Sequence, residues 1–86
     1  MAYNPFEETE EAVENSMDLE MVRDDLIAEL KSLNEYEAQV EMLDSEDAAD
    51  IIEQILEDKK GHVAKLMKLL KTLDPVQAEK MENELR

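Results

Sequence analysis

The chain contains no cysteine and no tryptophan, and only one glycine, one histidine and two prolines among its 86 residues. Without cysteine, neither a disulfide framework nor a thiolate metal site can form. With so few glycines and prolines, long segments run without a helix breaker, which favours an all-helical fold. No apolar run has the length of a membrane span and no secretory signal is apparent. We therefore expect a cytoplasmic protein, and the lumen of a protein shell would suit the same sequence.

Positive charge is also scarce. The chain has 9 Lys and Arg residues against 24 Asp and Glu residues, which gives a formal net charge of −15. Because phosphate backbones require a basic protein surface, this balance argues against binding of nucleic acid. Cationic partners or metal ions suit the charge better, and an acidic surface that only keeps a small oligomer soluble accounts for it equally well.

The first 15 residues are acidic and contain two of the three aromatic side chains, Tyr3 and Phe6. Their glutamates repel one another and offer little apolar surface for burial. We therefore expect residues 1–15 to form a flexible acidic arm, while the two aromatic side chains leave open the alternative that the arm docks on a partner.

Two long segments have the apolar periodicity of packed helices. In residues 16–43 the inward positions are Leu19, Val22, Leu26, Glu29, Leu33, Tyr36, Val40 and Leu43. In residues 45–73 they are Ala48, Ile52, Ile55, Lys59, His62, Leu66, Leu69 and Leu73. Asp44 and Ser45 between the segments favour a short turn and a helix cap. The sequence therefore predicts an antiparallel two-helix hairpin over residues 16–73.

A short third helix is expected over residues 74–86. Asp74 is a capping residue, Pro75 suits the first helical position and Gln77 is placed to bond back to the cap. The apolar stripe of this segment is thin, so we expect the helix to lie against one end of the hairpin.

The second long helix has another apolar row beside its inward row, at Ala49, Leu56, Val63 and Leu70. Ile27 and Leu30 add apolar surface on the first helix. One partner helix cannot cover both rows, and so wide an apolar face is typical of a helix in a four-helix bundle. We therefore expect the hairpin to dimerise into a four-helix bundle.

Polar residues interrupt the inward rows at one level of the expected hairpin. If the two helices fold back on each other, Glu29 lies beside Lys59 and His62. Buried charges are rarely kept without a partner or a metal. Two alternatives follow: the layer binds a metal, or it is a polar network that fixes the register of an oligomer.

The chain resembles the encapsulated ferritins and the related short ferritin-like domains associated with encapsulin shells. The resemblance covers residues 19–80 and rests on Glu29-Leu30, Tyr36-Glu37 and the segments 55–63 and 69–75. It implies a ferritin-like four-helix bundle completed by dimerisation, rings built from dimers and an encapsulin shell as a partner. It also implies a di-iron ferroxidase centre at the subunit interface.

Carried over by position, the family's glutamate and histidine ligands match Glu29 and His62, and its neighbouring tyrosine matches Tyr36. The second glutamate ligand is replaced by Lys59. In a dimer, two carboxylates and two ammonium groups sum to zero charge and do not offset two ferrous ions. Asp58 would complete a metal site with Glu29 and His62 only if the Lys59 side chain turned outward.

The sequence therefore predicts a diverged encapsulated-ferritin-like homo-oligomer with an altered or lost di-iron centre. The alternative is a metal-free assembly protein in which Glu29, Lys59 and His62 only fix the register. We expect the Lys59 ammonium to take the place of iron, to pair with Glu29 and thereby to suppress ferroxidase activity. The residues after Met81 do not resemble the usual cargo-loading tail.

Overall fold

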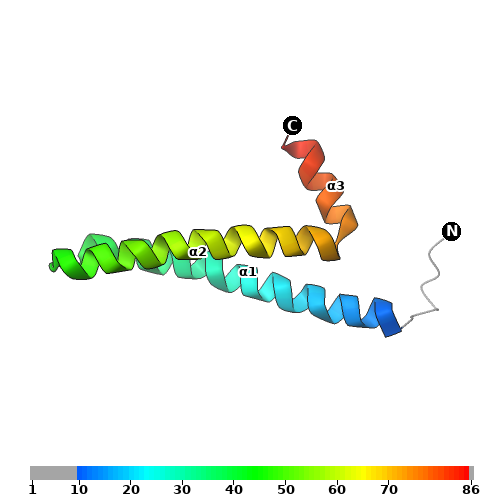
Figure 1. Cartoon of the computed structure of the whole chain (residues 1–86), viewed down its shortest axis with the longest axis horizontal. Coiled ribbons are helices and arrows are strands. Elements are labelled where there is room, and N and C mark those ends of the chain that lie inside the picture. The colour runs from blue at the N-terminus through cyan, green and yellow to red at the C-terminus, as the bar shows by residue number, and fades with distance from the viewer. Residues whose placement is uncertain (1–9, 86) are drawn as a thin grey trace.

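The computed structural model describes residues 10–85, with side chains from Ser16 onward. In this range it contains three helices and no strand: α1 (Glu10–Met42), α2 (Glu46–Leu73) and α3 (Pro75–Glu84). α1 and α2 lie side by side along the long axis and run in opposite directions, while α3 turns away from the pair where α2 ends (Figure 1). The predicted all-helical fold class is confirmed. No helix in the described range is long and apolar enough to cross a membrane.

α1 begins earlier than the sequence predicted. We expected the helix to start near Asn15, but it extends back to Glu10. Residues 10–15 contain neither proline nor glycine, and glutamates near a helix N-terminus interact favourably with the helix dipole. The expected acidic arm is therefore helical over residues 10–15, and residues 1–9 lie outside the described residues.

Ser45 sets the start of α2, as predicted. Its hydroxyl oxygen accepts a hydrogen bond from the backbone N–H of Ala48 at 3.2 Å. Glu46 and Asp47 occupy the first turn, where negative side chains compensate the positive end of the helix. Only residues 43–45 separate α1 from α2, so the chain reverses within a short turn.

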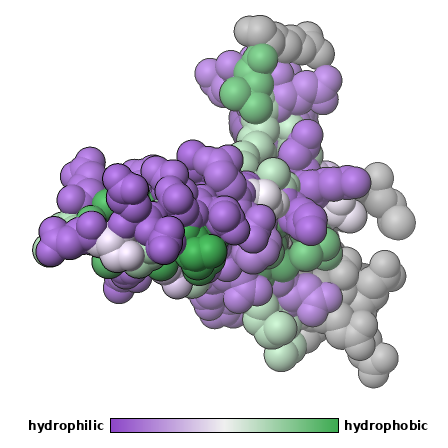
Figure 2. Space-filling model, turned by 60° about the vertical axis from the view of Figure 1, so that its left-hand side comes forward, coloured by the Kyte–Doolittle hydropathy of each residue, from purple (hydrophilic) through white to green (hydrophobic). Residues whose placement is uncertain are grey.

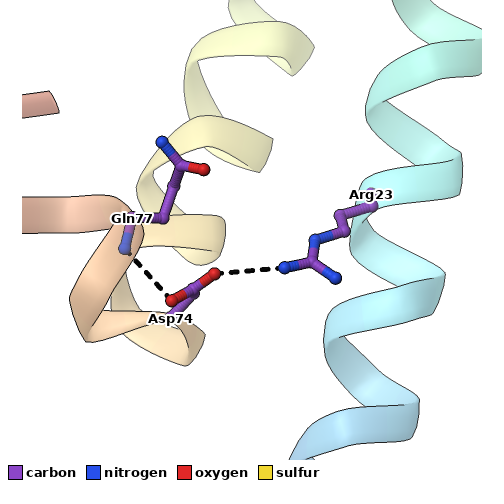
Figure 3. A network of polar contacts seen from close by, with 3 residues as sticks. All are labelled: Arg23, Asp74 and Gln77. Carbon is purple, nitrogen blue, oxygen red and sulfur yellow. Dashed lines mark hydrogen bonds and ion pairs between the residues drawn. The ribbon is translucent and has the colours of Figure 1, made fainter. Parts of the chain in front are cut away.

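Asp74 joins all three helices at one corner (Figure 3). Its carboxylate accepts a hydrogen bond from the backbone N–H of Gln77 at 3.1 Å, which caps α3. The same carboxylate accepts a hydrogen bond from the Arg23 guanidinium of α1 at 3.1 Å. The predicted cap is confirmed, although Gln77 contributes its backbone and not its side chain to this bond. The contact with Arg23 links the start of α3 to α1.

The α1/α2 pair has almost no core of its own. Among the side chains that the structure describes, only Val22 is buried, with 7% of its surface exposed. The remaining inward positions of α1 are half-buried, with the exception of Leu43, which is exposed. The predicted inward row of α1 is therefore correct up to the turn.

The inward row of α2 agrees with the prediction at six of its eight positions and differs at the other two. Leu56, Val63 and Leu70 were assigned to a second row that a partner would cover, yet they are already half-buried in the single chain. His62 and Leu69 were assigned inward positions, and they are exposed. Adjacent residues of a helix are about 100° apart around its axis, and both rows contain aliphatic residues. The pattern of apolar residues alone therefore does not show which row is more deeply buried. Both rows are therefore partly buried, and within the predicted inward row only His62 and Leu69 are exposed.

The molecule is thin. The described chain measures 59 × 30 × 14 Å with a radius of gyration of 17.9 Å, whereas a compact domain of this length would have a radius of about 12 Å. A single layer of helices cannot enclose a core. Apolar areas accordingly interrupt the hydrophilic surface (Figure 2), and the exposed large apolar side chains are Met17, Met21, Ile27, Leu30, Met42, Leu43, Ile51, Met67, Leu69, Val76 and Leu85.

Candidate functional site

Glu29 of α1 is the centre of a polar layer between α1 and α2. Lys59 Nζ of α2 lies 3.2 Å from Glu29 Oε2, at hydrogen-bond distance. His62 Nδ1, one turn further along α2, lies 3.6 Å from Glu29 Oε1. Both oxygens of the carboxylate therefore face nitrogen atoms of α2, and the structure brings the three predicted residues together.

The Lys59 ammonium has a second partner on α1. It lies 5.5 Å from the centroid of the Tyr36 ring, within the range of a cation–π interaction. The Lys59 and Glu29 side chains are 19% and 23% exposed, respectively. The ammonium is therefore held between a carboxylate and an aromatic ring in a position partly shielded from water. A metal site that includes Asp58 would require the Lys59 side chain to turn outward, and it does not. Asp58 itself is exposed.

His62 lies at the rim of the layer. Its side chain is 52% exposed, so the imidazole is not in the inward row where the sequence placed it. Its 3.6 Å distance to Glu29 is longer than a well-formed hydrogen bond. His62 is therefore a solvent-accessible neighbour of the Glu29–Lys59 pair and contributes less to holding the helices together.

Two hollows flank the polar layer on the side where His62 is exposed. The first, of about 360 Å³, is lined by Asp25, Ala28, Glu29, His62, Lys65 and Leu66. The second, of about 540 Å³, is lined by Tyr36, Ile55, Glu57, Asp58, Lys59, Gly61, His62 and Lys65. His62 and Lys65 belong to both linings, so the layer is open to other molecules from this side.

The residues present in the single chain do not fit a di-iron centre. Within residues 16–85 no group of three or more His, Asp and Glu side chains is placed to hold a metal ion. Divalent iron requires a surplus of negative charge from its ligands. The Lys59 ammonium neutralises the Glu29 carboxylate, which leaves the layer without that surplus.

The chain is similar to the encapsulin nanocompartment cargo protein EncC of Myxococcus xanthus (strain DK1622), with 35% identity over 57 residues. The match covers 66% of this chain and 44% of that protein. The chain therefore spans less than half the length of the curated relative that it matches. No protein family and no solved structure matches the chain.

Sequence reasoning missed Asp25 and Lys65, which line the hollows beside the polar layer. A signal for both was present in the spacing. Asp25 precedes Glu29 by four residues and Lys65 follows His62 by three, so each lies one helical turn from a predicted site residue and on the same side of its helix.

Proposed function

We propose that this chain is a component of an encapsulin nanocompartment. The observation that supports the proposal is its similarity to the encapsulin cargo protein EncC. Within the compartment the chain forms a ferritin-like homo-oligomer in which the Glu29–Lys59 ion pair occupies the position of the di-iron centre. Its role in this proposal is assembly, and it does not oxidise iron at this layer.

The shape of the subunit supports self-association. A layer only 14 Å deep leaves apolar side chains exposed on α2, among them Ile51 at 54% and Leu69 at 44%. Ile55, His62 and Leu69 follow one another at intervals of seven residues, so they form one row along the helix. A second copy related by a two-fold axis would cover this row, close the hollows beside Glu29 and complete a bundle of four long helices.

The contacts of Lys59 support a metal-free layer. A lysine ammonium is a compact cation, and here it lies 3.2 Å from the carboxylate that would otherwise bind iron. Dimerisation would add a second identical pair, so the layer would remain neutral and would gain no attraction for cations. The layer would then serve to fix the register of the two subunits.

Co-expression with the encapsulin shell protein of the same genome tests the association with a compartment. We expect the chain to co-purify with assembled shells and to resist added protease until the shells are opened. An acidic helical protein of similar size, expressed with the same shell, provides the control for trapping without specific contacts. A chain that remains outside the shells and is digested at the rate of the control would contradict the proposal.

The substitution Lys59→Glu tests the loss of the metal centre. In a dimer, the two Glu29 and two Lys59 side chains sum to zero charge, and the substitution changes that sum to −4. We expect the variant to melt at a lower temperature than the unmodified protein without metal, and anaerobic ferrous iron to recover the difference through binding to the folded state. The control Lys59→Met removes the ammonium without adding a ligand, so it should not respond to iron. Tight stoichiometric iron binding by the unmodified protein would show that the centre is retained.

A further inference from the structure

α2 and α3 form a groove that the proposed function does not use. It has a volume of about 570 Å³ and is lined by Ala64, Met67, Lys68, Lys71, Thr72, Ala78 and Met81. The two methionines and two alanines make its surface apolar, and Met67 remains 37% exposed. Lys68 and Lys71 are the charged residues of the lining, so the groove combines an apolar surface with a basic edge.

Basic surface is rare in this chain, which has a net charge of −15. Five of its nine Lys and Arg residues fall within residues 59–71 of α2. Within the described residues, neither Lys68 nor Lys71 forms an ion pair with a carboxylate. A segment that supplies both apolar and acidic side chains would therefore match the groove.

Residues 1–9 of the sequence have this composition. They contain the aromatic residues Tyr3 and Phe6 and the acidic residues Glu7 and Glu8, and they contain no Lys or Arg. Aromatic rings pack favourably against methionine sulfur, and carboxylates attract the two lysine ammonium groups. Pro5 favours an extended backbone at the residue before it, which suits a peptide lying along a groove.

The length of the chain rules out docking within one molecule. The Arg23–Asp74 contact places Arg23 at the corner where α3 begins, and Glu10 lies at the other end of a continuous helical segment, about 20 Å along the helix axis from Arg23. The groove lies along α2 and α3, whereas α1 continues beyond the corner toward its start (Figure 1). Four residues of extended chain reach at most about 14 Å from Glu10 to Phe6, which is too short to bring Phe6 into the groove of its own chain.

We propose that residues 3–8 of one copy bind the α2/α3 groove of a second copy. In this contact Phe6 packs on Met67 and Met81, and the two glutamates at positions 7 and 8 face Lys68 and Lys71. The contact joins different surfaces of the two copies, so it is heterologous and builds a ring or a longer array. The contact goes beyond the proposed two-fold dimer, because it uses neither the Glu29 layer nor the row formed by Ile55, His62 and Leu69.

Charge reversal in the full-length chain tests the contact. We expect Lys68→Glu/Lys71→Glu to weaken association beyond the dimer by about tenfold, and Glu7→Lys/Glu8→Lys to do the same, measured by sedimentation velocity. The matched control Lys31→Glu/Lys80→Glu makes the same change in net charge outside the groove and should leave the size distribution unchanged. Phe6→Ser should also reduce association, whereas Met42→Ser, at an exposed position at the end of α1, should not.

A mixture of the two charge-reversed proteins distinguishes a lost contact between chains from misfolding of the variants. Neither variant should assemble with copies of itself, because its groove and its N-terminal segment carry charges of the same sign. In the mixture, the acidic groove of the first variant matches the basic segment of the second. The basic groove of the second variant likewise matches the acidic segment of the first. Equal amounts should therefore restore the larger species. The proposal is overturned if mixing restores nothing, if the variants sediment like the unmodified protein, or if the unmodified protein never exceeds a dimer.

Discussion

Among single residues, Lys59 determines the chemistry of the layer between α1 and α2. Its ammonium lies 3.2 Å from Glu29 Oε2 and 5.5 Å from the centre of the Tyr36 ring. Both partners belong to α1, so one side chain of α2 makes two polar contacts across the helix pair. Because the pair is partly shielded from water, removing one member leaves the other poorly solvated, which makes the loss larger than for a surface ion pair.

The substitution Lys59→Met measures this contribution. Methionine keeps much of the side-chain volume but removes the charge, so the half-buried Glu29 carboxylate loses its closest partner. We expect the free energy of unfolding to fall by about 1–3 kcal/mol, measured by urea denaturation at one fixed protein concentration.

Lys60→Met provides a matched control on the adjacent residue. Lys60 pairs with Glu57 at 3.3 Å, and the two side chains are 52% and 72% exposed. A pair so exposed contributes little, and we expect a change of no more than about 0.5 kcal/mol. Equal losses for the two substitutions would show that the Glu29 layer gains nothing from its partial burial.

The proximity of Glu29 and Lys59 was predictable because it follows from the position of the turn. The two residues lie at equal distances, 15 residues each, from Asp44, and residues equally distant from the turn of two antiparallel helices lie side by side. The exposure of His62 was not predictable in the same way. It depends on the rotation of α2 about its own axis, which is set by packing across both aliphatic rows.

At the scale of the helices, short-range capping signals define the boundaries best. Ser45 and Asp74 were both recognised from sequence, and both accept a backbone hydrogen bond at a helix start. The start of α1 was placed too late, because an acidic composition was taken as a sign of an unstructured arm although residues 10–15 contain no helix breaker. The Arg23 contact with Asp74 was missed because it depends on how far a long side chain reaches between separate helices.

Two substitutions at Asp74 separate its roles at the corner of the three helices. Asp74→Ala removes both the cap of α3 and the ion pair with Arg23, and we expect a loss of about 1–2 kcal/mol with faster amide exchange in α3. Asp74→Asn keeps an oxygen that can cap the helix, so most of the protection in α3 should remain. Because Arg23 is 54% exposed, its ion pair should contribute little. If Asn is as damaging as Ala, the ion pair and not the cap holds α3 in place.

At the scale of the whole molecule, the single layer of helices leaves apolar side chains exposed, and this favours association with a partner. One buried side chain among those described gives a small hydrophobic contribution to stability, and a chain of this length is marginal even when compact. The net charge of −15 opposes association through repulsion between copies. In the proposed two-fold dimer, apolar contact would have to outweigh that repulsion, and added salt should favour this dimer by screening it.

Leu69→Glu tests where the copies meet. Leu69 is 44% exposed and belongs to the row with Ile55 and His62, so in the proposed dimer it becomes buried. Burying a leucine contributes about 1.5–3 kcal/mol, and a charge in its place should weaken the dimer by at least about tenfold. Met42→Glu, at a side chain 81% exposed beside the turn, introduces the same charge away from this row and should have little effect.

Sedimentation equilibrium and melting curves at several concentrations provide the measurement for Leu69→Glu. Because a monomer of this shape has almost no core, folding and association should be linked, and the melting temperature of the unmodified protein should rise with concentration. Leu69→Glu should lower the melting temperature at concentrations at which the unmodified protein is a dimer, because the variant then lacks the stabilisation that association provides. A stable monodisperse monomer at micromolar concentration, with a melting temperature independent of concentration, would mean that the thin helix pair is stable alone and that its exposed apolar row is not a subunit contact.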